Sequence, residues 1–332
     1  MKKLGVAIVL LVAALAGCNK KAADKAPETN AGSGATTTPQ TGSAGSAGMA
    51  GSAGSAAEVA WDGKTPLSLE GFQTPESVLY DADGDGYLVS NIGGQPLDLD
   101  DNGFISKISP DGKITELKWI DGAKDNIKLN APKGMAITGG LLYVADIDTV
   151  HKFDAKTGEL KGDIKIDGAT FLNDVAVAPD GGVYVTDSGL DKEFKGTGSD
   201  AVYMIGKDDK VKPVMKDKKL AAPNGITAGD KGAVWVVTFG SGEIYEVDAK
   251  GKQGKNQNLP KGQLDGVVVL DGGEVLVSSW EGSAIYRGKP GAEWKPVVEN
   301  VKSPADIGYD TKRHRILIPV FMGNTVIIQP TE

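Results

Sequence analysis

The chain has very little of the side-chain chemistry that disulfides, imidazole sites and nucleic-acid grooves require. Its 332 residues include one cysteine and two histidines, and acidic residues outnumber basic ones by 44 to 36. A single cysteine excludes an intrachain disulfide, and a net charge of −8 argues against a nucleic-acid partner. We find neither a phosphate-binding loop nor a dinucleotide-binding fingerprint, which argues against nucleotide enzymes of those classes.

Long apolar runs are also missing, apart from one near the N-terminus. Lys2 and Lys3 precede an apolar stretch over residues 4–15, and a small-residue segment leads to Cys18. This pattern is typical of an export signal, and the stretch is too short for an ordinary transmembrane helix. The letters LAGC resemble a bacterial lipobox, so we predict that residues 1–17 are a lipoprotein signal and that Cys18 is lipidated. An ordinary secretory signal with an incidental cysteine is the alternative.

The segment after the signal has almost nothing apolar to bury. Residues 18–57 consist mainly of Ala, Gly, Ser, Thr and Lys, so we expect a flexible tether with no fold of its own. Residues 58–332 are then one folded domain. Asn19 after the cysteine resembles the pattern of lipoproteins sent to the outer membrane. We therefore expect an exported protein that is held to that membrane by lipid and faces the periplasm or the cell surface.

A short anchor motif occurs six times, and each copy is followed at once by a run of small and β-branched residues. Successive anchors lie 40 to 57 residues apart. The anchors are Pro75-Glu76, Pro132-Lys133-Gly134, Leu172-Asn173-Asp174, Pro223-Asn224-Gly225, Leu264-Asp265-Gly266 and Pro304-Ala305-Asp306. An all-strand repeat of about 40–50 residues is typical of a β-propeller. The sequence therefore predicts an all-β, six-bladed β-propeller.

The strand pattern within each repeat predicts how the ring closes and which loops overhang it. The last repeat ends after its third strand, and a strand-like segment, residues 65–72, stands free before the first anchor. We predict that this N-terminal strand supplies the outer strand of the sixth blade, because it would pair an otherwise exposed edge. Residues 92–102 and 188–200 form long connections that should overhang the anchor face.

A propeller brings its anchors together around one axis, and the anchor side chains carry hard oxygen atoms. Glu76, Asn173, Asn224 and Asp265 would converge there, with Asp306 as a further contributor. Carboxylates and carboxamides suit Ca²⁺, and the lack of thiolate or imidazole ligands disfavours zinc and copper. We predict Ca²⁺ or another divalent cation at the axis. Alternatively, the Asn and Asp residues are there as turn formers.

The anchor order Glu, Asn, Asn, Asp resembles the senescence-marker-protein/gluconolactonase family of six-bladed propellers. The segments TPESVLYD, FLNDVAVAPDGGVYVTD, APNGITAG and LDGVVV carry the likeness. The resemblance implies that Glu76, Asn224 and Asp265 hold a divalent metal and that Asn173 completes the metal shell or touches substrate. It also implies that Asp265 is the catalytic group that helps to activate a water or takes a proton.

The chain departs from that family and its relatives at two anchors. Thr74-Pro75-Glu76-Ser77 replaces the usual Gly-Pro-aromatic beside the metal-binding Glu, and Lys133 stands where paraoxonases carry a catalytic His. We expect Lys133 at the rim, either binding an acidic substrate or simply solvated. His151 and His314 do not fall at the anchors, so we do not expect either to be catalytic.

Two functions remain open on these residues. The first is a membrane-anchored, calcium-dependent hydrolase of lactones or related esters, which the family resemblance favours. The second is a non-catalytic propeller that binds a ligand or partner protein, with a structural metal or none. We expect a monomer with a small-molecule partner. The acidic segment over residues 81–86 looks like the start of a calcium loop, but the strand that follows favours a hairpin turn.

Overall fold

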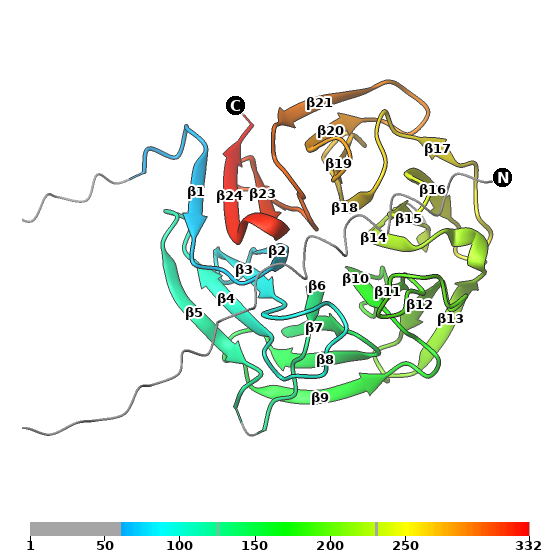
Figure 1. Ribbon diagram of the computed structural model, residues 1–332, viewed down its shortest axis with the longest axis horizontal. Coiled ribbons are helices and arrows are strands. Elements are labelled where there is room, and N and C mark those ends of the chain that lie inside the picture. The colour runs from blue at the N-terminus through cyan, green and yellow to red at the C-terminus, as the bar shows by residue number, and fades with distance from the viewer. Residues whose placement is uncertain (1–60, 125, 230–231, 332) are drawn as a thin grey trace, which may run out of the picture. The chain divides into compact units, whose positions relative to one another are not determined.

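The computed structural model describes residues 61–124, 126–229 and 232–331. Those residues form an all-β propeller of six four-stranded sheets (Figure 1), which confirms the fold class predicted from the anchors. The predicted signal, Cys18 and the tether up to residue 57 lie outside the described residues. Within the described part, none of the helical turns has the length and apolarity that crossing a bilayer would require.

The innermost strand of each blade begins at or just after an anchor, and the remaining strands follow outward in antiparallel order. Blades one to three contain β2 (Pro75–Asp81), β3 (Gly86–Asn91), β4 (Phe104–Ile108) and β5 (Ile114–Asp121); β6 (Pro132–Thr138), β7 (Leu141–Asp146), β8 (Thr149–Asp154) and β9 (Leu160–Lys165); β10 (Leu172–Val177), β11 (Val183–Asp187), β12 (Ala201–Ile205) and β13 (Val211–Lys216). Blades four to six contain β14 (Pro223–Ala228), β15 (Val234–Thr238), β16 (Glu243–Val247) and β17 (Gln257–Asn258); β18 (Leu264–Val269), β19 (Val275–Ser279), β20 (Ala284–Gly288) and β21 (Trp294–Glu299); β22 (Gly308–Asp310), β23 (Arg315–Val320), β24 (Thr325–Pro330) and β1 (Leu67–Glu70).

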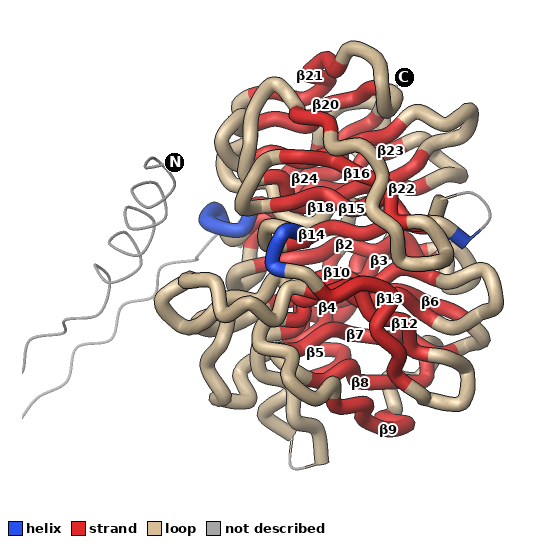
Figure 2. The backbone as a smooth tube through the Cα atoms, turned by 90° about the vertical axis from the view of Figure 1, so that its right-hand side faces the viewer, coloured by secondary structure: helices blue, strands red, loops and turns tan. Residues whose placement is uncertain are grey.

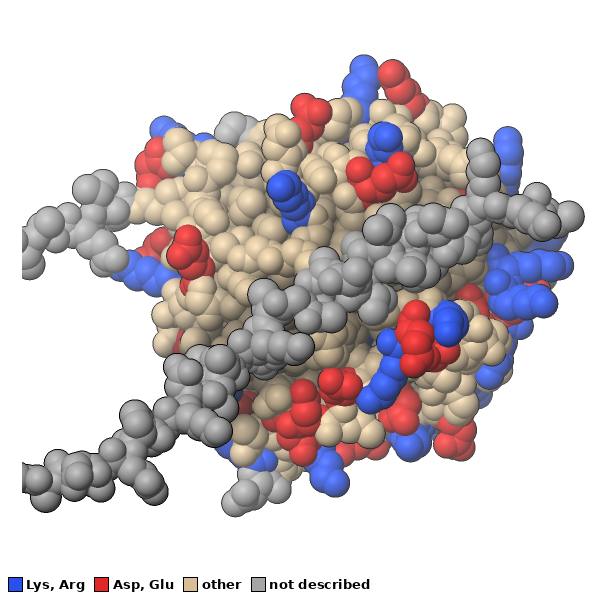
Figure 3. Space-filling model, in the orientation of Figure 1, with Lys and Arg blue, Asp and Glu red and all other residues tan. Residues whose placement is uncertain are grey.

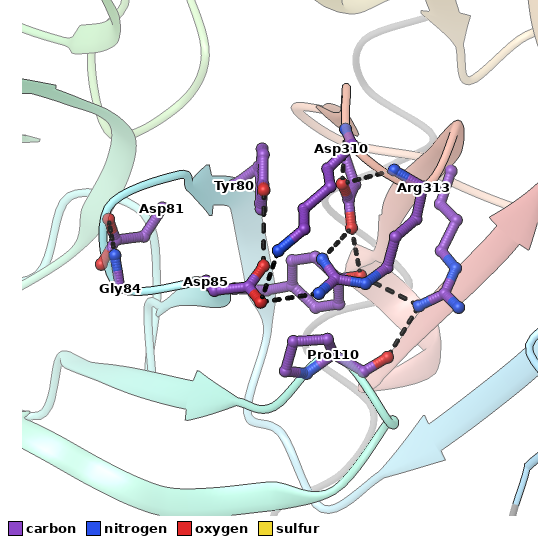
Figure 4. Close-up of polar contacts among 10 residues, drawn as sticks. Tyr80, Asp81, Gly84, Asp85, Pro110, Asp310 and Arg313 are labelled. Atoms are coloured by element: carbon purple, nitrogen blue, oxygen red, sulfur yellow. Dashed lines mark hydrogen bonds and ion pairs between the residues drawn. The ribbon is translucent and has the colours of Figure 1, made fainter.

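The seam between the sixth and first blades is bridged by strand pairing and by buried polar contacts. β1 pairs antiparallel with β24, so the sixth sheet contains strands from both ends of the described chain. The Tyr87 hydroxyl of blade one donates to Asp310 of blade six at 2.7 Å. Arg313 donates to Asp310 at 3.1 Å and to Asp85 at 2.7 Å (Figure 4). These contacts hold the two blades together on the face opposite the anchors.

The apolar core is divided among the contacts between neighbouring blades. One such cluster joins Leu88 and Ile105 of blade one to Leu142 and Phe153 of blade two, and all four side chains are fully buried or nearly so. The other blade pairs have equivalent clusters. Figure 2 shows the strands crossing the thickness of the ring, with loops projecting from both of its faces. The ring is therefore a rigid frame for the loops at its faces.

The inner strands bulge directly after their anchors. In β2, β6, β10, β14 and β18 the register with the next strand shifts at the anchor residues. A bulge leaves residues out of the ladder and turns their side chains. In blade three, Thr186 Oγ1 accepts from the Asp174 N–H at 2.9 Å and donates to the Asn224 carbonyl at 2.6 Å. The hydroxyl thus ties one anchor to the next.

The two long loops lie where the strand order places them. They connect β3 to β4 and β11 to β12, and an ion pair of 3.1 Å joins Lys192 in the second loop to Asp98 in the first. The acidic segment after Asp81 is the hairpin turn between β2 and β3, as predicted. On the face shown in Figure 3, most charged side chains lie toward the edge of the ring, with both signs interspersed.

Candidate metal centre

Four buried oxygen atoms at the anchors have no hydrogen-bond partner. They are Glu76 Oε2, Asn173 Oδ1, Asn224 Oδ1 and Asp265 Oδ1. An unsatisfied buried polar atom costs about 1–3 kcal/mol, so four together need an explanation. Only seven side-chain atoms of the described residues are in this condition, and four of them belong to the four predicted ligands.

Neighbouring side chains fix the orientation of two of these groups. The Trp280 indole Nε1 donates to Asp265 Oδ2 at 2.8 Å, which leaves Asp265 Oδ1 as the unpartnered atom. Asn173 Nδ2 donates to Ser188 Oγ at 3.1 Å, which assigns Asn173 Oδ1 the acceptor position. Ser188 in turn donates to the carbonyl of Pro223 at 2.7 Å. The free oxygens of Asp265 and Asn173 are therefore oriented by hydrogen bonds that Trp280 and Ser188 make with the other polar atom of each side chain.

The buried anchor carboxylates raise one another's pKa values. Burial, then the nearby Asp265 and Asp306 carboxylates, raise the pKa of Glu76 well above its usual range. Burial and Asp306 likewise raise the pKa of Asp265, although hydrogen bonds from Trp280 and Asn224 oppose the rise. A positive charge among these groups would reverse both effects, because it stabilises carboxylates.

Lys133 does not lie at an exposed rim, and that part of the prediction was wrong. Its side chain is 1% exposed, and Nζ donates to the Ala131 carbonyl at 2.8 Å. Nζ also lies 4.8 Å from the centre of the Phe171 ring, a favourable cation–π distance. Burial lowers the pKa of Lys133, while Asp146 and Glu76 oppose that change. The lysine is an internal countercharge to the acidic anchors.

The second position of each anchor forms a separate layer that the sequence analysis did not distinguish. Asp174 Oδ2 accepts from the Ile226 N–H at 2.7 Å, and Asp306 Oδ2 accepts from Ser77 Oγ at 2.5 Å. Both carboxylates line a channel of about 520 Å³ that runs along the inner strands away from the four free oxygens. Asp306 is therefore not a sixth member of the ligand ring, whose sixth position is Ala305. The sequence signal that marks the layer is that every second position holds a small residue or Asp, namely Ser77, Gly134, Asp174, Gly225, Gly266 and Asp306.

The comparisons with known proteins agree with the residue pattern. Residues 108–308 match the SMP-30/Gluconolactonase/LRE-like region. This chain belongs to that family. The matched stretch contains Asn173, Asn224 and Asp265, and Glu76 lies before it. No curated protein matches the chain.

Solved structures similar to this gluconolactonase-family propeller share its fold at low identity. A gluconolactonase from Xanthomonas campestris is 19% identical, with a TM-score of 0.62, over 80% of this chain and 89% of that one. A virginiamycin B lyase from Staphylococcus aureus is 15% identical, with a TM-score of 0.57, over 80% of this chain and 98% of that one. At such identities the likeness is one of fold, and one fold carries several chemistries.

The donor set of this family member fits a hard divalent cation. No cluster of three or more His, Cys, Asp or Glu side chains suited to a metal occurs among the described residues. The four free oxygens instead come from two carboxylates and two carboxamides, a mixture that Ca²⁺ accepts readily. Their convergence on one axis and their lack of other partners are the observations that support a cation here.

The two histidines lie away from these oxygens, as predicted. His151 is buried in β8, where Nδ1 lies 2.7 Å from Asp163 and Nε2 lies 3.2 Å from Asp146. Asp146 also accepts from the N–H groups of Asn130 and Ala131, immediately before the second anchor. His151 therefore helps to hold the loop that precedes Lys133. His314 is exposed just before β23.

Proposed function

We propose that the chain is a hydrolase of lactones or related esters that depends on a divalent cation, with Ca²⁺ as the expected ion. Family membership supports a lactonase-like function. The observation that carries the proposal is the set of four buried, unpartnered oxygens on Glu76, Asn173, Asn224 and Asp265. A purely structural ring would gain nothing from leaving four such atoms unsatisfied.

The residues have separate roles in this proposal. Glu76, Asn224 and Asp265 would hold the cation, and Asn173 would complete its shell or orient the substrate. When bound, the cation supplies positive charge that polarises the substrate carbonyl and favours the oxyanion. Trp280 fixes one carboxylate oxygen of Asp265, and the other would face both the cation and the attacking water, whose proton Asp265 takes. Water adds to the carbonyl carbon, the ring C–O bond breaks, and the proton passes to the leaving alkoxide to give the hydroxy acid.

Lys133 acts within the protein in this scheme. Because it is buried beside Glu76 and Asp146, its ammonium offsets part of the negative charge of the anchors. Substrate contact by Lys133 would require displacement of its hydrogen bond to Ala131. We therefore expect Lys133→Met to weaken folding as well as activity, whereas a lysine that only binds substrate would change KM.

The test combines metal analysis with a substrate screen on the purified protein. The wild type should bind one Ca²⁺ that Asp265→Asn loses or holds much more weakly, and should hydrolyse aldonolactones, homoserine lactones or aryl esters only with the ion present. A protein that binds no cation in millimolar calcium contradicts the site. A protein that binds calcium but turns over none of the three substrate classes supports the non-catalytic, ligand-binding propeller instead.

We also propose that the mature chain starts at lipidated Cys18 and is held at the outer membrane, facing the periplasm or the cell surface. The LAGC sequence and the Gly/Ser/Ala tether support this. Mass spectrometry of the membrane-extracted protein should show an acylated N-terminal cysteine, and Cys18→Ser should move the protein to the soluble fraction. Equal partitioning of wild type and Cys18→Ser would contradict the anchor.

A further inference from the structure

A second ring of residues lies just above the anchors, and most of its members are apolar. Each follows the second strand of its blade. They are Ile92, Ile147, Ser188, Phe239, Trp280 and Phe321. In five blades the backbone N–H of this residue donates to the carbonyl of the residue just before the anchor. The positions are therefore structurally equivalent, and they surround the same axis as the four free oxygens.

Three aromatic members from consecutive blades contact one another and form a continuous wall. The ring centres of Phe239 and Trp280 are 5.5 Å apart in an edge-to-face arrangement, and those of Trp280 and Phe321 are 5.1 Å apart. Phe321 begins the turn η3 (Phe321–Gly323), which lies next to the middle of the ring in Figure 1. We call Phe239, Trp280 and Phe321 the aromatic wall.

The aromatic wall stands directly beside the candidate metal centre. Trp280 contributes both its ring to the wall and its N–H to Asp265. Phe321 packs with Ile92, Ala131 and Ala305, and Ile147 and Trp280 lie against the same cluster. The apolar surface thus extends over blades one, two, five and six.

The wall remains partly open to solvent. Phe239 and Trp280 are only half-buried, whereas Phe321 is buried with the 44% exposed Met322 beside it. Exposed apolar surface that adjoins convergent polar groups is typical of a ligand site. The ring position above Asn173 is the small polar Ser188, whose hydroxyl is occupied by Asn173 and Pro223. A polyhydroxylated substrate would find few free hydrogen-bonding groups on this ring.

We propose that the aromatic wall selects lactones or esters that carry an apolar alkyl or aryl substituent, in preference to polyhydroxylated aldonolactones. The inference rests on the proposed hydrolase function and adds a substrate class to it. The substituent would pack on Phe239, Trp280 and Phe321 while the carbonyl faces the free oxygens. Each methylene buried on the wall is worth about a fourfold gain in affinity, and a good apolar pocket discriminates about 10-fold or more per methylene.

The experiment measures kcat/KM for γ-lactones with side chains of zero to six carbons, and for glucono-δ-lactone, with the calcium-loaded full chain. The wild type should gain several-fold per added methylene, and glucono-δ-lactone should be the poorer substrate. Phe239→Ser should flatten the chain-length dependence. Trp280→Phe should lower kcat, because Asp265 loses its donor, yet keep the dependence on chain length.

Phe194→Ser is the matched control. Phe194 is a half-buried phenylalanine in the long loop after β11, and its ring packs on Phe171, 6.3 Å away, outside the wall. This variant should keep the wild-type chain-length dependence. Faster hydrolysis of glucono-δ-lactone than of the alkyl lactones would overturn the proposal, as would an unchanged dependence in Phe239→Ser.

A binding measurement separates this proposal from the proposed hydrolase. Lactams with the same side chains resist hydrolysis, so their binding to the calcium-loaded chain can be followed by calorimetry without turnover. Suppose that no lactone is hydrolysed, but that lactam affinity rises with chain length and falls in Phe239→Ser. That result contradicts the proposed hydrolase function and supports the aromatic wall as a binding site for apolar substituents. If lactam affinity does not change with chain length, the proposal that the aromatic wall binds the apolar substituent is contradicted, whether or not the chain hydrolyses lactones.

Discussion

At the scale of single residues, the carboxylates of Glu76, Asp265 and Asp306 and the ammonium of Lys133 form one electrostatic unit. Glu76 and Asp265 repel each other and Asp306, and Lys133 offsets part of this repulsion. Carboxylates buried this closely are costly unless something positive joins them. A cation bound here would relieve the repulsion among these carboxylates.

His151 gives a residue-scale prediction about pH. Burial alone would lower its pKa, but Asp146 and Asp163 raise it to about 9 from the ordinary 6.5. A raised pKa means that the stabilisation is fully present below about pH 6.5 and is lost as pH rises through about 9. This group accounts for roughly 3 kcal/mol, at 1.36 kcal/mol per pH unit.

The measurement is urea unfolding at pH 6, 7.5 and 9, for the wild type and His151→Gln. The difference in unfolding free energy between the two proteins should shrink as the pH rises, because only the wild type loses an imidazolium. A difference that is constant across this range would show that His151 is neutral in the folded protein.

At the scale of the element, the inner strands approach one another so closely that some anchor positions exclude any side chain. A Cβ added at Gly266 would lie 2.3 Å from the Ile307 nitrogen and 2.8 Å from the Asp306 Cα, both backbone atoms that cannot move aside. Gly225 has the same relation to the Asp265 carbonyl, at 2.2 Å. Glycine there lets the strands converge and sets the spacing of the ligands.

Gly266→Ala should therefore destabilise the protein by about 1–3 kcal/mol, the usual cost of overpacking, and should weaken cation binding because Asp265 is its neighbour. Denaturant unfolding and calcium titration measure the two effects. Gly196→Ala is the control, since no atom lies within 4 Å of an added Cβ there. Equal stability of the two variants would contradict close packing at the anchor.

The seam between the first and last blades gives a second element-scale prediction. Asp310 is fully buried and accepts from the side chains of Tyr87 and Arg313 and from the backbone N–H groups of Lys312 and Arg313, so Asp310→Ala removes the acceptor of all four donors (Figure 4). We expect a loss of roughly 3 kcal/mol, as for a broken buried pair, measured by urea unfolding. Asp85→Asn removes a half-buried partner of the same arginine at the surface, and the loss should be clearly smaller because surface ion pairs contribute little. Similar losses in both variants would contradict the buried role of Asp310.

At the scale of the whole molecule, the ring converts a sequence repeat into one site, so a cation should stabilise the entire propeller. Ligand that binds only the folded state adds about 2.7 kcal/mol at a concentration of 100 times Kd. The thermal midpoint of the wild type should therefore rise with calcium and fall with a chelator.

Glu76→Gln is the decisive variant for this effect. It removes a buried, repelled carboxylate, so the chelated protein should be more stable than chelated wild type, while stabilisation by calcium is lost or much reduced. Differential scanning calorimetry of wild type and Glu76→Gln, each with calcium and with chelator, gives the four thermal midpoints to be compared. If Glu76→Gln keeps the full calcium effect, the cation binds elsewhere.

The sequence by itself determined the number of blades and the first-position anchor residues, because both are local. A Pro or Leu at the start of an anchor, repeated every 40 to 57 residues, identifies each blade without knowledge of its neighbours, and in five of the six anchors the next residue is polar. The four free oxygens belong to residues that were found in this way. The same pattern predicted that neither histidine lies at the axis.

Only the tertiary structure decided the surroundings of those residues. It buried Lys133, assigned Asp174 and Asp306 to a separate layer beside the channel, and brought Trp280 to Asp265. The position of each of these side chains depends on the face of the bulged strand from which it projects. It also depends on which residues of the next blade pack against it. Those contacts join residues of different blades, so a reading of one repeat at a time does not contain them.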